Sequence, residues 1–279
     1  MKSIKFKKMV ATVAFTNTLQ TTIPATALYS VMEEHFLNNK TGKIPKLLFI
    51  GYDGCIANAL TTRTNIDESA IFTLAKSGGL YLGKTGGAKK GGQETSTAPG
   101  WASLFTGTWA TTNGVYHNDD ELAKTISPIF YTLEFKQIKS KFCFSWDPHR
   151  SVTYKNVAEM APQIFCQAQD DDGTFDAMKK SIEDDSTQAI FGILEYLDHA
   201  GHTFGFSVSK EKYIEALSDS ERVASKLIDI VNKRKTLDLE DWLIVITTDH
   251  GGVNRGHGGR TIMESTIFFA SNKKIFYST

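Results

Sequence analysis

From residue 46 onward, short apolar runs alternate with longer amphipathic segments. This alternation predicts an α/β fold in which strands lie between layers of helices. We expect strands at the start of 78–96 and in 46–54, 142–146, 189–198, 241–252 and 264–271. We expect helices in 67–79, 99–107 and 212–234, and the last of these repeats its apolar positions at the helical period.

Acidic residues follow three of the predicted apolar strands. Asp53, Asp198 and the pair Asp249-His250 each stand where such a run ends. In open α/β sheets, ligands bind beyond the carboxyl ends of the strands, so these side chains are expected to lie together. Because several carboxylates in one place repel each other, their convergence predicts a bound cation.

Histidines enlarge this acidic set near the end of the chain. In "DHAGH", Asp198 and His202 are four residues apart, and the intervening glycine is expected to turn the backbone so that both face one ion. In "GHGG", glycines flank His257 and allow close backbone approach. With Asp53, Asp249 and His250, the chain offers six candidate ligands, which suffice for two ions. Each residue alone is more typical of a solvated loop or a helix cap, but their joint clustering favours zinc or a similar divalent metal.

A candidate nucleophile lies in "TSTAPGWASLFTG". Thr95, Ser96 and Thr97 precede Pro99 at the expected start of a helix, which we predict to open directly after Thr97. A hydroxyl at a helix N-terminus stands in a positive field that favours an anionic substrate or an alkoxide. An ordinary Ser/Thr N-cap explains the same residues, so both interpretations stay open at this point.

Composition limits the alternatives. The 279 residues carry 31 basic and 31 acidic side chains, so no basic excess indicates binding to a nucleic-acid polymer. No apolar run reaches the length of a transmembrane helix. Three widely spaced cysteines form no CxxC pair, which argues against a thiolate zinc site and a disulfide framework. A single Cys143–Cys166 bridge is left open, and the oligomeric state is not determined.

The N-terminus has the outline of an export signal. A basic "MKSIKFKK", a short apolar "MVATVAF" and the small residues "ATA" precede Leu28. Residues 1–27 are therefore interpreted either as a signal peptide or as a disordered leader, followed by a single domain in 28–279. A signal peptide predicts a secreted or periplasmic protein, whereas a leader leaves a cytoplasmic location open.

Four motifs in order, "LLFIGYDG", "TSTAPGWASLFTG", "YLDHAGH" and "ITTDHGG…GHGG", resemble the alkaline phosphatase superfamily. Within it the chain resembles the type I phosphodiesterase/nucleotide pyrophosphatase branch. The resemblance implies a three-layer α/β/α sandwich around a mostly parallel sheet. It also implies a small phosphate ester as substrate, with a phosphodiester or pyrophosphate bond cleaved through a covalent phospho-threonine. The implied ligands are Asp198, His202 and His257 for one zinc, and Asp53, Asp249, His250 and the nucleophile Thr97 for the other.

Two residues after Thr97 differ from the family pattern at positions that are expected to contact the substrate. Gly100 stands where the phosphodiesterases have an asparagine, and Trp101 stands where sulfatases have an arginine; both are predicted to contact the substrate. A sulfatase is disfavoured because Thr97 cannot be converted into formylglycine. A phosphomonoesterase of the same superfamily and a metal-binding protein without activity remain alternatives.

Overall fold

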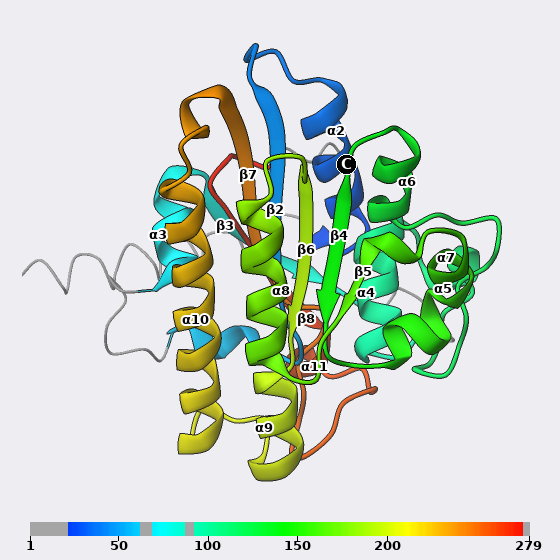
Figure 1. Cartoon of the computed structure of the whole chain (residues 1–279). Coiled ribbons are helices and arrows are strands. Elements are labelled where there is room, and N and C mark those ends of the chain that lie inside the picture. The colour runs from blue at the N-terminus through cyan, green and yellow to red at the C-terminus, as the bar shows by residue number, and fades with distance from the viewer. Residues whose placement is uncertain (1–21, 62–68, 87–91, 276–279) are drawn as a thin grey trace, which may run out of the picture.

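The computed structural model describes residues 22–61, 69–86 and 92–275. Within this part of the chain, eight strands form one sheet in the order β1-β3-β8-β7-β2-β6-β4-β5 (Figure 1). The strands are β1 Ile23–Pro24, β2 Ile44–Tyr52, β3 Gly79–Lys84, β4 Ser140–Phe144, β5 Phe165–Gln167, β6 Ala189–Leu194, β7 Glu240–Thr247 and β8 Thr266–Ser271. Among them only β8 is antiparallel to its neighbours, so the prediction of a mostly parallel sheet is confirmed.

The centre of the sheet consists of β6, β2 and β7. The strand β2 pairs in parallel with both neighbours, from Leu47 opposite Ala189 to Tyr52 opposite Leu194 on one side. Parallel strands covered on both faces have apolar side chains on both, which explains why these segments are almost continuous hydrophobic runs.

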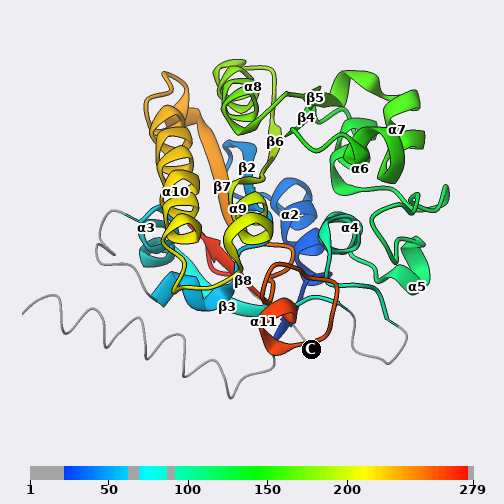
Figure 2. The ribbon, with the colours of Figure 1, turned by 90° about the horizontal axis from the view of Figure 1, so that it is seen from below.

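Helices cover both faces of the sheet. Figure 2 shows α2, α4 and α6 on one side of it and α3, α8 and α10 on the other. The apolar core is divided accordingly, with Phe49, Phe105 and Phe191 in one cluster and Ile50, Leu217 and Ile246 in the second. The helices are α2 Ala27–Leu37, α3 Ala70–Ser77, α4 Thr97–Thr106, α5 Ala110–Asn113, α6 Ile129–Phe135, α7 Lys155–Met160, α8 Asp171–Glu183, α9 Tyr196–Phe204, α10 Glu211–Asn232 and α11 Ile262–Ser265, with short helical turns at η2 Ala57–Thr61, η4 His149–Thr153, η5 Pro162–Ile164 and η6 Leu237–Leu239.

Two predicted boundaries are wrong in ways that affect the site. The strand expected in 189–198 ends at Leu194, and α9 begins at Tyr196, so Asp198 lies in the first turn of a helix. The helix expected after Thr97 begins at Thr97 itself. In α9 the buried Leu197 and Ala200 are three residues apart and share one face, as helical spacing requires. This spacing was missed because the helix directly follows the apolar residues of β6.

The folded unit includes residues that the sequence assigned to a leader. Ile23 and Pro24 pair with β3, and Ala25 is fully buried, so residues 23–27 pack as part of the domain expected to begin at 28. Residues 1–21, which carry the signal-like pattern, lie outside the described residues, as do 87–91 of the glycine-rich loop. No described helix is long and apolar enough to cross a membrane.

The strands β4 and β5 place Cys143 opposite Cys166, and both are free thiols.

Candidate active site

Two adjacent strands deliver the first group of side chains. Gly51 in β2 pairs with Thr247 in β7, and each chain continues two residues to an aspartate, Asp53 and Asp249. The side chains of both aspartates and of the next residue, His250, are fully buried. One ligand atom from each of the three lies within 4.8 Å of the other two. Parallel register therefore accounts for the convergence that the strand ends predicted.

The hydroxyl of Thr97 joins this group. Its Oγ1 lies 3.4 Å from Asp53 Oδ1 and donates a hydrogen bond to it. His250 Nε2 lies 3.3 Å from the same carboxylate oxygen and 3.4 Å from Asp249 Oδ2. Thr97 is the first residue of α4, so its hydroxyl also stands at the positive end of that helix. No side-chain cap is recorded at Ser96, the N-cap residue, so the N-cap interpretation of this motif is not supported there.

A second group forms on α9 and the loop after β7. Asp198 and His202 are one helical turn apart, with His202 Nε2 3.3 Å from Asp198 Oδ2. The helical spacing brings them together, and not the glycine-induced turn that we expected. His257 reaches the same place from its loop, with Nε2 3.5 Å from Asp198 Oδ1 and 3.0 Å from His202 Nε2.

The histidine rings are oriented as metal ligands would be. His250 Nδ1 lies 2.8 Å from the carbonyl oxygen of Gly251, and His202 Nδ1 lies 3.0 Å from that of Arg255. A carbonyl oxygen can only accept, so each Nδ1 carries a proton, and the Nε2 of each ring is the nitrogen left to bind a metal once it is deprotonated. Ligating histidines use this same pattern of a donated second N–H.

Several of these buried atoms have no hydrogen-bond partner. They are Asp198 Oδ1, Asp249 Oδ2 and His250 Nε2. Buried polar atoms are normally satisfied, and leaving one unpaired costs about 1–3 kcal/mol, more if it is charged. Unpaired carboxylate oxygens and an unpaired imidazole nitrogen fit a divalent cation, so the residues present suit a metal.

The shifted pKa values of the clustered side chains also indicate a site suited to a cation. Burial and the nearby Asp53 raise the pKa of Asp249 well above its usual range. Burial lowers the pKa of His250, but Asp249 and Asp53 outweigh it and bring that pKa to about 10. Burial and the neighbouring His250 lower the pKa of His257 to about 4. The carboxylates thus draw positive charge into their midst, which is the charge a metal would supply.

Gly100 and Trp101, both in α4, lie against the two aspartates of the first group. Trp101 is fully buried, and its Nε1 donates a 2.8 Å hydrogen bond to Asp53 Oδ2. A Cβ on Gly100 would lie 2.9 Å from the carbonyl oxygen of Asp249, so a side chain does not fit there. In α4 both residues lie against the aspartates that follow β2 and β7, and their contact with a substrate stays a prediction.

The loop that carries His257 is fixed by Thr95 and Glu264, a role that the sequence did not predict for either residue. Thr95 Oγ1 donates to the carbonyl oxygen of Gly259, and Gly258 N–H donates to the carbonyl oxygen of Thr95. Glu264 accepts the N–H of Gly259 and of Thr261. These bonds tie the loop to the segment that precedes Thr97, so the nucleophile candidate and His257 keep a fixed relation.

Two further polar residues near the site escaped sequence reasoning. Glu195 is buried beside Asp53 and Asp198, with one atom of each within 4.8 Å. Glu195 is the first polar residue after β6 and could have been found in that way, but the strand was predicted to extend to residue 198, four residues beyond its end. Asn118 accepts the N–H of Ala98 through Oδ1 and so lies next to Thr97. Nothing in its local sequence, "HND", distinguishes it from a surface loop residue.

Solved structures with the same fold support the architecture. Murine ectonucleotide pyrophosphatase / phosphodiesterase 5 superposes with a TM-score of 0.53 and 15% identity, over 75% of this chain and 57% of that one. Phosphonoacetate hydrolase from Sinorhizobium meliloti 1021 gives 0.53 and 13%, over 75% and 57%. Phosphonate monoester hydrolase of Agrobacterium radiobacter gives 0.56 and 11%, over 82% and 68%. The chain therefore spans less than two thirds of the first two proteins. No curated protein sequence matches it.

The sequence itself also matches a family profile. The profile of type I phosphodiesterase / nucleotide pyrophosphatase covers residues 47–258, from β2 to the loop that carries His257. This range includes all seven of the predicted metal ligands, from Asp53 to His257. The resemblance drawn from the four motifs is confirmed, and the chain belongs to the type I phosphodiesterase / nucleotide pyrophosphatase family.

Proposed function

We propose that this protein hydrolyses phosphodiester or pyrophosphate bonds of a small phosphate ester at a two-metal centre, with Thr97 as nucleophile. The observation that carries the proposal is the convergence of unpaired ligand atoms from Asp198, Asp249 and His250 beside the Thr97 hydroxyl. Membership of the family supports the reaction class. One protein of the same fold, murine ectonucleotide pyrophosphatase / phosphodiesterase 5, has been solved as an inactive threonine-to-alanine form with AMP, which supports both the nucleophile and the ligand type.

The two groups of side chains divide into two metal sites. Asp53, Asp249, His250 and Thr97 would hold one ion, and Asp198, His202 and His257 the other. Mixed imidazole and carboxylate ligands favour zinc. Two such ions would polarise the phosphoryl oxygens and lower the pKa of the attacking hydroxyl.

The chain's own residues define the covalent steps. Thr97 Oγ1 attacks phosphorus while the bond from phosphorus to the departing oxygen breaks, and the hydroxyl proton ends on the departing alcohol or, for a pyrophosphate bond, on the departing phosphate group. The product is a phosphoryl ester of Thr97. A water molecule then attacks the same phosphorus, the bond to Oγ1 breaks, and one proton of the water returns to Thr97. Trp101 and the N–H of Gly54 keep Asp53 and Asp249 in place throughout.

A hydrolysis panel tests the function. p-Nitrophenyl phosphate, bis-p-nitrophenyl phosphate and p-nitrophenyl-thymidine monophosphate are compared with and without zinc. We expect zinc-dependent cleavage of at least one diester, in preference to the monoester. Faster cleavage of the monoester would favour the phosphomonoesterase alternative, and no cleavage by the metal-loaded protein would favour a metal-binding protein without activity.

Two neighbouring hydroxyls test the nucleophile. Thr97→Ala should lower turnover by roughly 10³-fold or more, whereas metal content stays near that of the parent. Ser96→Ala, a change of the adjacent buried hydroxyl, should retain most of the activity. Retained turnover in Thr97→Ala would rule out the covalent role.

Two aspartates, one two residues beyond the carboxyl end of β7 and one near its start, test the metal ligands. Asp249→Ala should bind one metal ion fewer per chain, because it removes a buried ligand atom. Asp241→Ala, near the start of the same strand and paired with Lys273, should bind as much metal as the parent. Equal metal content in both variants, measured by atomic emission, would contradict the assignment of Asp249.

A further inference from the structure

Two of the three cysteines of the chain stand opposite each other in the sheet. Cys143 in β4 pairs with Cys166 in β5, the short strand at one edge of the sheet (Figure 1). Neighbouring strands lie about 4.7–4.9 Å apart, and the two Cα atoms of a disulfide lie about 4.4–6.8 Å apart. The strand pairing therefore holds the two Cα atoms within the range of a disulfide, near its lower limit.

Both thiols lie on the same face of the sheet. Cys143 belongs to the apolar cluster covered by α3, α8 and α10, and Cys166 packs against that cluster. Phe142 and Phe144, which flank Cys143 in β4, belong to the cluster on the opposite face. A hydrogen bond also joins the two thiols. Register and face thus direct both sulfur atoms to one place, as a disulfide requires.

The two thiols differ in reactivity. Cys143 is fully buried, whereas Cys166 is half-buried on the edge strand, where an oxidant can reach it. The hydrogen bond from Cys143 lowers the pKa of the Cys166 thiol to about 7 against the effect of burial, and Lys141 and Lys180 also lower it. The same hydrogen bond and burial raise the pKa of Cys143 well above its usual range. Near neutral pH, Cys166 is therefore the thiol that is partly ionised, and the thiolate is the form that reacts with oxidants.

We propose that Cys166 is a site of reversible oxidation by hydroperoxides, with Cys143 as the resolving thiol that closes an intramolecular disulfide. This reaction goes beyond the proposed hydrolysis and does not depend on it. Pairing across adjacent strands, a shared face and unequal exposure carry the proposal.

The oxidation proceeds in two steps. The Cys166 thiolate attacks one oxygen of hydrogen peroxide, the O–O bond breaks, and the departing hydroxide takes up the proton that the thiol had released. The product is a sulfenic acid on Cys166. The sulfur of Cys143 then attacks the sulfur of Cys166, the S–O bond breaks, and hydroxide leaves with the Cys143 proton as water. In total the two thiols lose two electrons and two protons, and one peroxide becomes two water molecules.

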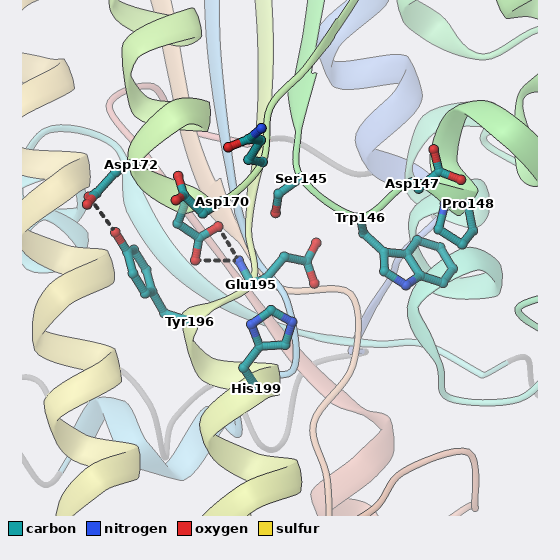
Figure 3. A pocket seen from close by; sticks show the side chains of 11 residues that line it. Ser145, Trp146, Asp147, Pro148, Asp170, Asp172, Glu195, Tyr196 and His199 are labelled. Carbon is teal, nitrogen blue, oxygen red and sulfur yellow. Dashed lines mark hydrogen bonds between the residues drawn. The ribbon is translucent and has the colours of Figure 1, made fainter.

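The disulfide would connect two segments that border one cavity. Residues 145–148 follow β4 directly, residues 169–172 begin two positions after β5, and both segments line a cavity of about 460 Å³ (Figure 3). A bond between β4 and β5 would therefore limit the relative movement of these segments. Because the Cα spacing is near the lower limit for a disulfide, the bond would be strained, and strained disulfides are the more easily reduced ones.

Thiol counting tests the proposal. The whole chain is reduced, treated with hydrogen peroxide, alkylated in denaturant and analysed by intact mass and by peptide mapping. We expect two of the three thiols to be lost and one cross-linked peptide pair, which contains Cys143 and Cys166, to be found. Dithiothreitol should restore both thiols. Cys55 is fully buried and serves as the internal control that stays a thiol.

Variants separate the roles of the two cysteines. In Cys143→Ala the resolving thiol is missing, so Cys166 should stop at the sulfenic acid, which a dimedone label detects. In Cys166→Ala, Cys143 should stay reduced at peroxide concentrations that cross-link the parent. Cys55→Ala is the matched control and should form the cross-link as the parent does. Urea unfolding shows which variants are folded, and Cys166→Ala, on the edge strand, keeps the test available if the core variant Cys143→Ala does not fold.

Several results would overturn the proposal. One is retention of every thiol at peroxide concentrations that oxidise a small free thiol such as glutathione. A cross-link that includes Cys55, or a Cys166–Cys166 bond between two chains, would show that Cys143 is not the resolving thiol. Oxidation of Cys143 in Cys166→Ala at the rate of the parent would show that Cys166 is not the site of attack.

Discussion

Trp101 offers a sharp test of how the fold supports the proposed metal centre. Its indole is fully buried, and the Nε1–H donates to Asp53 Oδ2 at 2.8 Å while the ring stacks on Phe105. Trp101→Phe removes this donor but keeps an aromatic ring in the core. Asp53 then loses the bond that orients its carboxylate.

The size of the effect follows from that single bond. A hydrogen bond to a charged group contributes about 1.5–3 kcal/mol. Because 1.4 kcal/mol corresponds to a factor of about ten in an equilibrium constant, metal affinity should decrease roughly 10–100-fold. Loss of a residue that orients a metal ligand typically has an effect of about this size.

The chain contains a matched control for this experiment. Trp242 is also buried and donates its Nε1–H to Glu240 Oε2 at 2.8 Å, near the amino end of β7 and away from the metal ligands. Zinc affinity of Trp101→Phe, Trp242→Phe and the parent is measured by competition with a chromophoric chelator, and stability by urea unfolding of the metal-free proteins.

We expect both variants to lose stability by a similar amount, and only Trp101→Phe to lose zinc affinity. If zinc binds equally well to Trp101→Phe and to the parent, the indole does not position Asp53 for a metal. If both variants bind zinc equally poorly, the loss comes from general destabilisation. Either result would refute the reasoning.

Further predictions concern close packing and pH. Gly54 has a φ of +68°, and a Cβ there would lie 2.8 Å from Asp198 Oδ1, so Gly54→Ala should lower both stability, by about 1–2 kcal/mol, and zinc affinity. Gly100→Ala places a Cβ against Asp249 and should destabilise the metal-free protein by about 1–3 kcal/mol in urea unfolding. Although burial acts to raise the pKa of Glu240, its hydrogen bonds, the first from Arg234, lower it to about 2. The stability that this carboxylate contributes is present above its unfolded pKa of about 4.5 and is lost toward pH 2. Glu240→Gln should therefore flatten the pH dependence of stability across that range, and an unchanged slope would contradict this account.

The sequence by itself determined the type of fold and most of the candidate ligands. Strands covered on both faces must be apolar along their whole length, so their ends are visible as the first polar residues. Asp53 and Asp249 were found in this way, because parallel strands in register bring their carboxyl ends to one edge of the sheet. The family motifs then singled out Thr97 among three adjacent hydroxyl residues.

Only the tertiary structure decided what each side chain faces. Trp101 was expected at the substrate, yet the packing of α4 on the sheet turns it inward to Asp53. Glu195 was hidden inside an apolar run that contains both the end of β6 and the start of α9. A short apolar segment has no period long enough to separate strand from helix, and the direction of a side chain depends on neighbours distant in the chain. The cavity beside the predicted metal ligands is therefore a property of the assembled fold, formed by segments after β4, at the start of α8 and after β6 that carry no shared motif.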